Sequence, residues 1–276
     1  HEILSLCEEI GAEAYPILNA GVLCQARSNN IPAATGELLD QFVKDATDLL
    51  DYCWGDPSTN EMAAKRAQNG HEETFDLKYV GIGNENWDDK YFKNFDIIYD
   101  RVMEYKEANY PDRELTVIAA SGTAADDGNN QKAWNWLKQN HAGDNILVDE
   151  HYYVGTNFSQ RQDDRYDYFL REEEGGLPVF LGEYATHVGV PNSMESALSD
   201  AAYMTGIERN SDIVKNVSYA PLFNKMGSTN WQTDLIWFDE YNSIGSINYY
   251  VQQMFSRYTG DQTIKALLDR QGERYT

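Results

Sequence analysis

The chain has 276 residues, a length that fits one large domain or two modest ones. Acidic side chains outnumber basic ones by 45 to 22, and the formal net charge of -23 disfavours phosphate backbones and anionic lipids as partners. Hydrophobic residues make up 42%, enough for a core, and no apolar run is long enough to cross a membrane. A neutral ligand is expected instead, and a sugar suits the 19 tyrosines and 6 tryptophans.

The predicted elements start at the first residue. Ile3, Leu4, Cys7 and Ile10 repeat at helical spacing from His1, so we expect the chain to begin inside a helix and to be a piece of a longer polypeptide. Short runs rich in β-branched and aromatic residues then predict strands at 14–19, 77–85, 115–121, 146–153, 177–184 and 216–222. Amphipathic stretches between and after them predict helices at 37–52, 91–109, 131–140, 160–174, 193–209 and 246–257.

Strands that alternate with helices at this spacing indicate a parallel α/β fold. A doubly wound sheet usually carries a glycine-rich phosphate loop after a strand, and the sequence has none. Polar residues instead follow the strands, where a (β/α)8 barrel (a TIM barrel) places its chemistry. We therefore expect an incomplete barrel over residues 1–260, corresponding to about strands 3 to 8. A tail at 261–276 would lead toward an absent C-terminal β-sandwich.

Two glutamates, Glu85 and Glu183, each close an apolar strand shortly after a glycine. A carboxylate at the mouth of a barrel is costly to bury without a partner or a task. Two of them on different strands can flank one glycosidic bond, as a proton donor and a nucleophile. The alternative is that each glutamate pairs with an arginine or caps a helix.

Four further residues are candidates for contacting a substrate. Asn84 precedes Glu85 and could hold a sugar hydroxyl, while His151 and Tyr153 should share one strand face, opposite Tyr152. Trp231, in a predicted loop, could form a sugar platform. A satisfied structural histidine and ordinary core tryptophans are the alternatives. Neither a metal-binding motif nor a cysteine pair is evident, so we predict no metal site and expect Cys7, Cys24 and Cys53 to be buried free thiols rather than catalytic ones.

Several strings together resemble glycoside hydrolase family 51, chiefly α-L-arabinofuranosidases. They are the opening HEILSLCEEIGAEAYPILNAG, GIGNENW at 81–87, EHYY at 150–153, GEYA at 182–185, SYAPLF at 218–223 and WQTDLIWFD at 231–239. The similarity follows the family's order along nearly the whole chain. The family's first two barrel strands and its C-terminal β-sandwich have no counterpart in this sequence.

The resemblance implies a retaining exo-hydrolase that needs no cofactor and releases arabinofuranosyl residues from arabinoxylan, arabinan or their oligosaccharides. By motif, Glu85 matches the general acid/base and Glu183 the nucleophile. Asn84 matches the amide that contacts the sugar 2-hydroxyl, and His151, Tyr153 and Trp231 match residues that line the sugar pocket. The acid should be protonated near neutrality.

Other interpretations stay open at this stage. The chain could belong to another retaining barrel glycosidase, an endoglucanase or a β-xylosidase, or to a catalytically silent carbohydrate-binding barrel. The resemblance also allows a homo-oligomer. The acidic composition suits a secreted protein and a cytoplasmic one equally well.

Overall fold

A computed structural model describes residues 1–28, 30–124, 127–189, 191–262 and 264. The chain divides into two compact units. The first contains residues 1–153, 169–185 and 212–220, and the second contains 154–168, 186–211 and 221–276. Among the described helices, none combines the length and the apolar character needed to cross a membrane.

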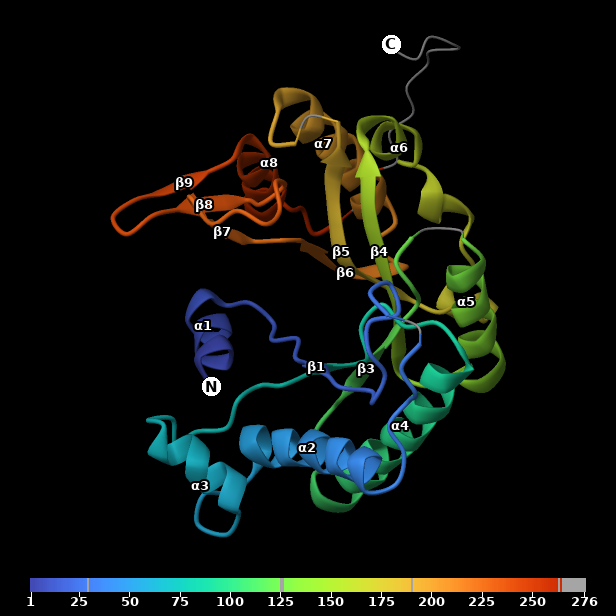
Figure 1. Cartoon of the computed structure of the whole chain (residues 1–276), viewed down its shortest axis with the longest axis vertical. Helices are drawn as coiled ribbons and strands as arrows, with labels where there is room; N and C mark the ends of the chain where they lie inside the picture. The colour runs from blue at the N-terminus through green and yellow to red at the C-terminus, as the bar shows by residue number, and fades with distance from the viewer. Residues whose placement is uncertain (29, 125–126, 190, 263, 265–276) are drawn as a thin grey trace. The chain divides into compact units, whose positions relative to one another are not determined.

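The first unit is built on a six-stranded sheet whose spatial order equals its chain order, β1 to β6 (Figure 1). The strands are β1 (Ile17–Leu18), β2 (Tyr79–Ile82), β3 (Thr116–Ala120), β4 (Ile146–Gly155), β5 (Val179–Val188) and β6 (Val214–Tyr219). Neighbouring strands pair in parallel. All six coincide with predicted runs, and this curled parallel sheet is the expected incomplete (β/α)8 barrel.

The helices follow the strands in the order that a barrel requires. They are α1 (Glu2–Ile10), α2 (Glu37–Trp54), α3 (Glu61–Gln68), α4 (Asp89–Asn109), α5 (Gly128–Asn140), α6 (Thr156–Arg161), α7 (Met194–Arg209) and α8 (Ile247–Arg257). The predicted helices at 37–52, 91–109, 131–140, 193–209 and 246–257 are confirmed within a few residues, as is the helix that starts after His1.

The continuous helix predicted at 160–174 is wrong. The chain forms only α6 and two 3-10 turns, η1 (Arg165–Tyr168) and η2 (Glu172–Glu174). The Arg209 side chain donates a hydrogen bond to the backbone carbonyl of Asp163, which is then not available to a helix. The backbone of Arg171 is extended, and this interrupts the helical hydrogen bonds a second time. Long-range contacts have overridden a local amphipathic pattern.

Two features were not predicted. Helix α3 is short and largely polar, and its buried Arg66 donates to the carbonyls of Tyr52, Gly55, His71 and Glu72. The second unit contains a three-stranded sheet in the order β7 (Phe223–Lys225), β8 (Ile236–Phe238) and β9 (Ser243–Gly245). Strands of three residues carry too little periodicity to be recognised in a sequence.

The interior of the six-stranded sheet is apolar near its centre. Ile118, Leu147 and Phe180, from three neighbouring strands, form a buried cluster against which Tyr15 and Tyr79 pack. The ring of Tyr15 meets that of Phe180 edge-on, with 4.6 Å between centroids. This core fixes β2, β4 and β5 relative to one another, and these strands carry or lead to the polar groups at their carboxyl ends. Residues 263 and 265–276 of the predicted tail lie outside the described residues, and its start at residue 261 stays a prediction.

Candidate active site

Glu85 lies in a strained turn just after β2. Its φ of 50° falls in the left-handed region that non-glycine residues seldom occupy. The segment around Cys24 holds this turn by three hydrogen bonds: Gln25 N–H donates to the Glu85 carbonyl, the Trp87 N–H to the Gln25 side chain, and the Asn86 amide to the Leu23 carbonyl. Such strain persists only where the surroundings over-determine it.

The same segment brings a thiol to Glu85. Cys24 is half-buried, and its Sγ donates to Glu85 Oε2 at 2.8 Å. All three cysteines are free thiols, but the expectation that they are buried holds only for Cys53, because Cys7 and Cys24 are partly exposed. The contact of Cys24 with Glu85 could not be predicted, because 61 residues separate the two side chains in the sequence. Only the hydrogen bonds between the two segments make them neighbours.

Glu183 lies within β5, directly after Gly182. The pairing of β5 with β6 shifts register between Leu181 and Tyr184, an irregularity of the kind that re-aims a side chain at a barrel rim. The Glu183 carboxylate accepts a hydrogen bond from the Tyr153 hydroxyl at 2.7 Å. Its side chain keeps 29% exposure, so it is open to a ligand from one side.

His151 lies between the two glutamates. Its Nδ1 is 3.4 Å from Glu85 Oε1 and 3.6 Å from Glu183 Oε2, and its Nε2 is 3.2 Å from Asp149 Oδ2. His151 is buried, with the ring among three carboxylates. Burial lowers the pKa of this imidazole, but the charges and hydrogen bonds of Asp149 and the glutamates outweigh it and raise that pKa to about 10. The ring is therefore a cation at neutral pH.

The predicted alternation along β4 is confirmed. Tyr153 and His151 turn toward the glutamates, whereas Tyr152 is buried and donates to Glu150. Glu150 also accepts the Trp134 indole N–H at 3.0 Å. Glu150, the acidic residue of the EHYY string, thus lies on the face of β4 opposite to His151 and Tyr153.

The carboxyl of Glu85 is more acidic than an ordinary glutamate. The hydrogen bond from His151 lowers its pKa most; burial opposes this, and the Cys24 hydrogen bond lowers it further. The expectation of an acid that is protonated near neutrality is therefore not met in this state of the site. The reason is the imidazolium, whose charge the sequence did not reveal.

Glu85, His151 and Glu183 also offer ligand atoms that all lie within 4.8 Å of one another, a spacing that a metal ion could use. Metal binding requires a neutral imidazole. The three carboxylates around His151 favour a proton on that ring, and this proton would compete with a metal ion for the imidazole nitrogen.

The remaining candidates differ in their surroundings. Asn84 stands beside Glu85, and its backbone N–H donates to the Asn86 side chain. Trp231 lies in the second unit, in the loop between β7 and β8 as predicted, and stacks on His187 with 4.2 Å between ring centroids. The Trp231 contact with a sugar stays a prediction, because one indole face is already covered.

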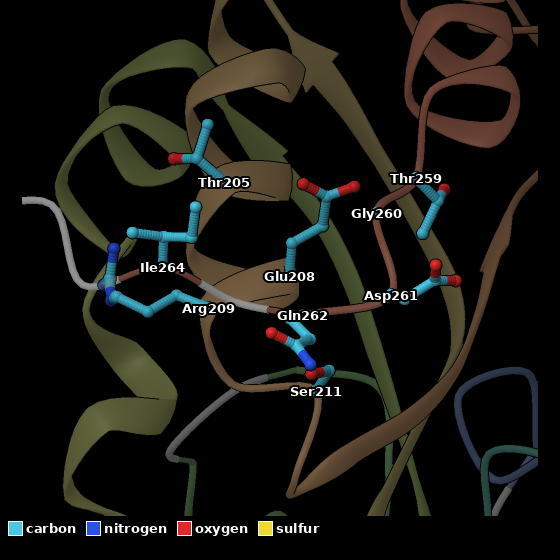
Figure 2. A pocket seen from close by; sticks show the side chains of 9 residues that line it. All are labelled: Thr205, Glu208, Arg209, Ser211, Thr259, Gly260, Asp261, Gln262 and Ile264. Carbon is cyan, nitrogen blue, oxygen red and sulfur yellow. The ribbon is translucent and has the colours of Figure 1, made fainter.

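A cavity of about 550 Å3 lies elsewhere, in the second unit (Figure 2). Helix α7 contributes Thr205, Glu208 and Arg209 to its wall, and the segment after α8 contributes Thr259, Asp261 and Gln262. Arg209 is engaged by Asp167 and by the Asp163 carbonyl. None of the predicted site residues lines this cavity.

Comparison with known proteins gives a consistent result. A family model described as an alpha-L-arabinofuranosidase 1 domain matches residues 1–171, and one described as an alpha-L-arabinofuranosidase C-terminal domain matches 182–275. The chain is 37% identical over 268 residues to an extracellular exo-alpha-L-arabinofuranosidase of Streptomyces chartreusis, covering 96% of this chain and 30% of that protein. It is 35% identical over 274 residues to alpha-L-arabinofuranosidase A of Aspergillus niger, covering 96% and 39%.

Solved structures agree. The arabinose-bound GH51 α-L-arabinofuranosidase MgGH51 superposes with a TM-score of 0.72 at 29% identity, covering 94% of this chain and 40% of that one. A family 51 α-L-arabinofuranosidase of Bifidobacterium longum superposes with a TM-score of 0.65 at 17% identity, covering 93% and 55%, which shows the shared fold. The chain thus spans between 30% and 39% of the length of the two curated relatives above.

Proposed function

Because this chain belongs to the family of α-L-arabinofuranosidases, we propose that it carries the catalytic centre of a retaining exo-glycosidase. The substrate is a non-reducing terminal α-L-arabinofuranosyl residue of arabinoxylan, arabinan or their oligosaccharides. The alternatives of an endoglucanase, a β-xylosidase or a silent binding barrel predict different results in the substrate tests below.

The closeness of the two glutamates carries this proposal. One carboxylate oxygen of Glu85 and one of Glu183 lie within 4.8 Å of each other. Retaining glycosidases hold their two carboxyl groups about 5–5.5 Å apart, whereas inverting enzymes need about 6.5–9.5 Å to admit a water molecule. A pair this close supports nucleophilic attack by one of the two carboxylates.

The reaction has two displacements. Glu183 attacks the anomeric carbon while Glu85 gives its proton to the departing glycosidic oxygen, forming a glycosyl-enzyme ester. Glu85, now ionised, then takes a proton from water as that water attacks the anomeric carbon and Glu183 leaves. Asn84, next to the acid/base in the sequence, would hold the sugar 2-hydroxyl.

The contacts of each carboxylate fit its role. The Tyr153 hydroxyl at 2.7 Å stabilises Glu183 as an anion, the form needed both for attack and for leaving. Glu85 receives hydrogen bonds from His151 and Cys24, which favour its ionised form and so its action as a base in the second step. Because the same contacts oppose its protonated form, the first step should be fastest in acid.

The decisive assay is release of 4-nitrophenol from 4-nitrophenyl α-L-arabinofuranoside by the protein at its natural full length. We expect turnover with retention of configuration, which NMR of the first-formed sugar reports. Glu183→Ala should abolish turnover, whereas Glu13→Gln, at a half-exposed glutamate paired with Lys78, should retain it. Absence of turnover on this substrate, with hydrolysis of a cellooligosaccharide or a β-xyloside, would refute the arabinofuranosidase assignment in favour of those alternatives.

Two further properties are proposed from the relatives of this chain. The Streptomyces relative is named extracellular, which favours secretion over a cytoplasmic location. The family resemblance favours a homo-oligomer. Fractionation of the source culture and light scattering of the purified protein test these two properties.

A further inference from the structure

A third carboxylate, that of Asp149, lies behind the glutamate pair. Asp149 precedes His151 by two residues on β4, faces the same way and is 2% exposed. Its Oδ2 is 3.2 Å from His151 Nε2, while its Oδ1 meets no hydrogen-bond donor among the described residues. A carboxylate buried this deeply needs a partner to remain charged. His151 is that partner.

The glycine before Glu183 makes room for this carboxylate. A Cβ added at Gly182 would lie 2.1 Å from Asp149 Oδ1, a distance that no side chain could accept. The glycine of the GEYA string is therefore explained by Asp149 rather than by its backbone conformation. Strand β5 presents Glu183 on one side of this contact and leaves space for Asp149 on the other.

We propose that Asp149 is a positioning residue for the glutamate pair: it holds Nε2 of His151 so that the Nδ1–H of that ring points between Glu85 and Glu183. This inference rests on the proposed function. It adds a residue that neither the sequence motifs nor the comparisons assign, and it gives His151 a defined orientation and charge.

The charges around His151 explain what this orientation achieves. Carboxylates face the ring from three elements: Asp149 on β4, Glu85 after β2 and Glu183 on β5. Other titratable or charged groups act on these carboxylates, namely Cys24 and Arg27 on Glu85, Tyr153 on Glu183, and Tyr15 and Tyr91 on Asp149. The Asp149 charge is the strongest of the influences that raise the His151 pKa. Without it, burial would favour the neutral ring, and Glu85 would then keep its proton to higher pH.

The test is the pH profile of kcat/KM for Asp149→Asn with the 4-nitrophenyl arabinofuranoside. We expect the high-pH limb, which reports Glu85 in the free enzyme, to move up by about one pH unit, the low end for loss of a nearby charge. At the optimum, kcat should fall about tenfold. The matched control is Asp144→Asn, which removes the carboxylate of another His–Asp pair, with His141, and should leave the profile unchanged. An unshifted limb in folded Asp149→Asn overturns the proposal.

If Asp149→Asn does not fold, a second measurement tests the proposed role of Asp149. NMR of the imidazole carbons in the unaltered protein, with His151 assigned by the signal lost in His151→Asn, reports the charge of the ring directly. The ring should stay protonated beyond pH 8, and a titration midpoint below pH 8 overturns the proposal. Because this readout needs no turnover, a protonated ring in a protein that cleaves no arabinofuranoside would remove the proposed function while supporting the role of Asp149.

Discussion

Removing the Tyr153 hydroxyl tests the nucleophile most directly. This hydroxyl donates to Glu183 Oε2 at 2.7 Å. In the second displacement Glu183 leaves the sugar as a carboxylate, so a hydrogen bond to its developing charge lowers the barrier. Tyr153→Phe deletes that bond and keeps the ring, and we therefore expect hydrolysis of the glycosyl-enzyme to slow.

The expected size follows from the surroundings of Glu183. A hydrogen bond to a charged group contributes about 1.5–3 kcal/mol. Since the Glu183 side chain is 29% exposed, water can replace part of the lost bond, and the lower part of that range, about 1.5–2 kcal/mol, applies. At about 1.36 kcal/mol per tenfold, kcat should fall about 13- to 30-fold.

The assay is steady-state and stopped-flow release of 4-nitrophenol. Because 4-nitrophenol is a good leaving group, glycosyl-enzyme should accumulate in Tyr153→Phe, giving a burst and a lowered KM. Tyr152→Phe is the matched control, since the adjacent buried Tyr152 donates to Glu150 on the other strand face. The reasoning is refuted if Tyr153→Phe keeps kcat within twofold of the unaltered protein, or if both variants lose activity equally.

Three further predictions concern the charges of Glu85 and His151 and the stability of the fold. Because the pKa of Glu85 is lowered, kcat/KM should decline tenfold per pH unit above a midpoint below the usual glutamate value of about 4.3; a midpoint near 6 would contradict this. Since His151 is protonated, dialysis against EDTA should leave kcat/KM unchanged, and a loss restored by a divalent metal would refute the imidazolium. Arg66→Met removes the hydrogen bonds that a buried guanidinium gives to four backbone carbonyls and should lower the unfolding free energy by about 3 kcal/mol in urea titrations, whereas Arg113→Met should change it little.

Local sequence patterns predict much of the fold. The six strand runs and most helices were predictable because apolar periodicity reports which face of an element is buried. The helix predicted at 160–174 failed because contacts such as that of Arg209 with the Asp163 carbonyl come from distant parts of the chain. Local periodicity does not register such contacts.

The candidate site divides in the same way. Glu85 and Glu183 could be singled out because each follows a glycine at the end of an apolar strand, and strand alternation placed His151 and Tyr153 on one face. The sequence alone thus determined which groups stand at the strand ends, since that depends on the order of residues along each strand.

Only the tertiary structure decided how those groups act on one another. The Cys24 thiol reaches Glu85 across 61 residues, and Asp149 reaches His151 within space that Gly182 leaves open. The charge on His151, and with it the acidity of Glu85, arises from carboxylates on β4, on β5 and just after β2 that the fold brings together. Ionisation depends on distance and burial in three dimensions, and neither quantity is encoded in the spacing of residues along a chain.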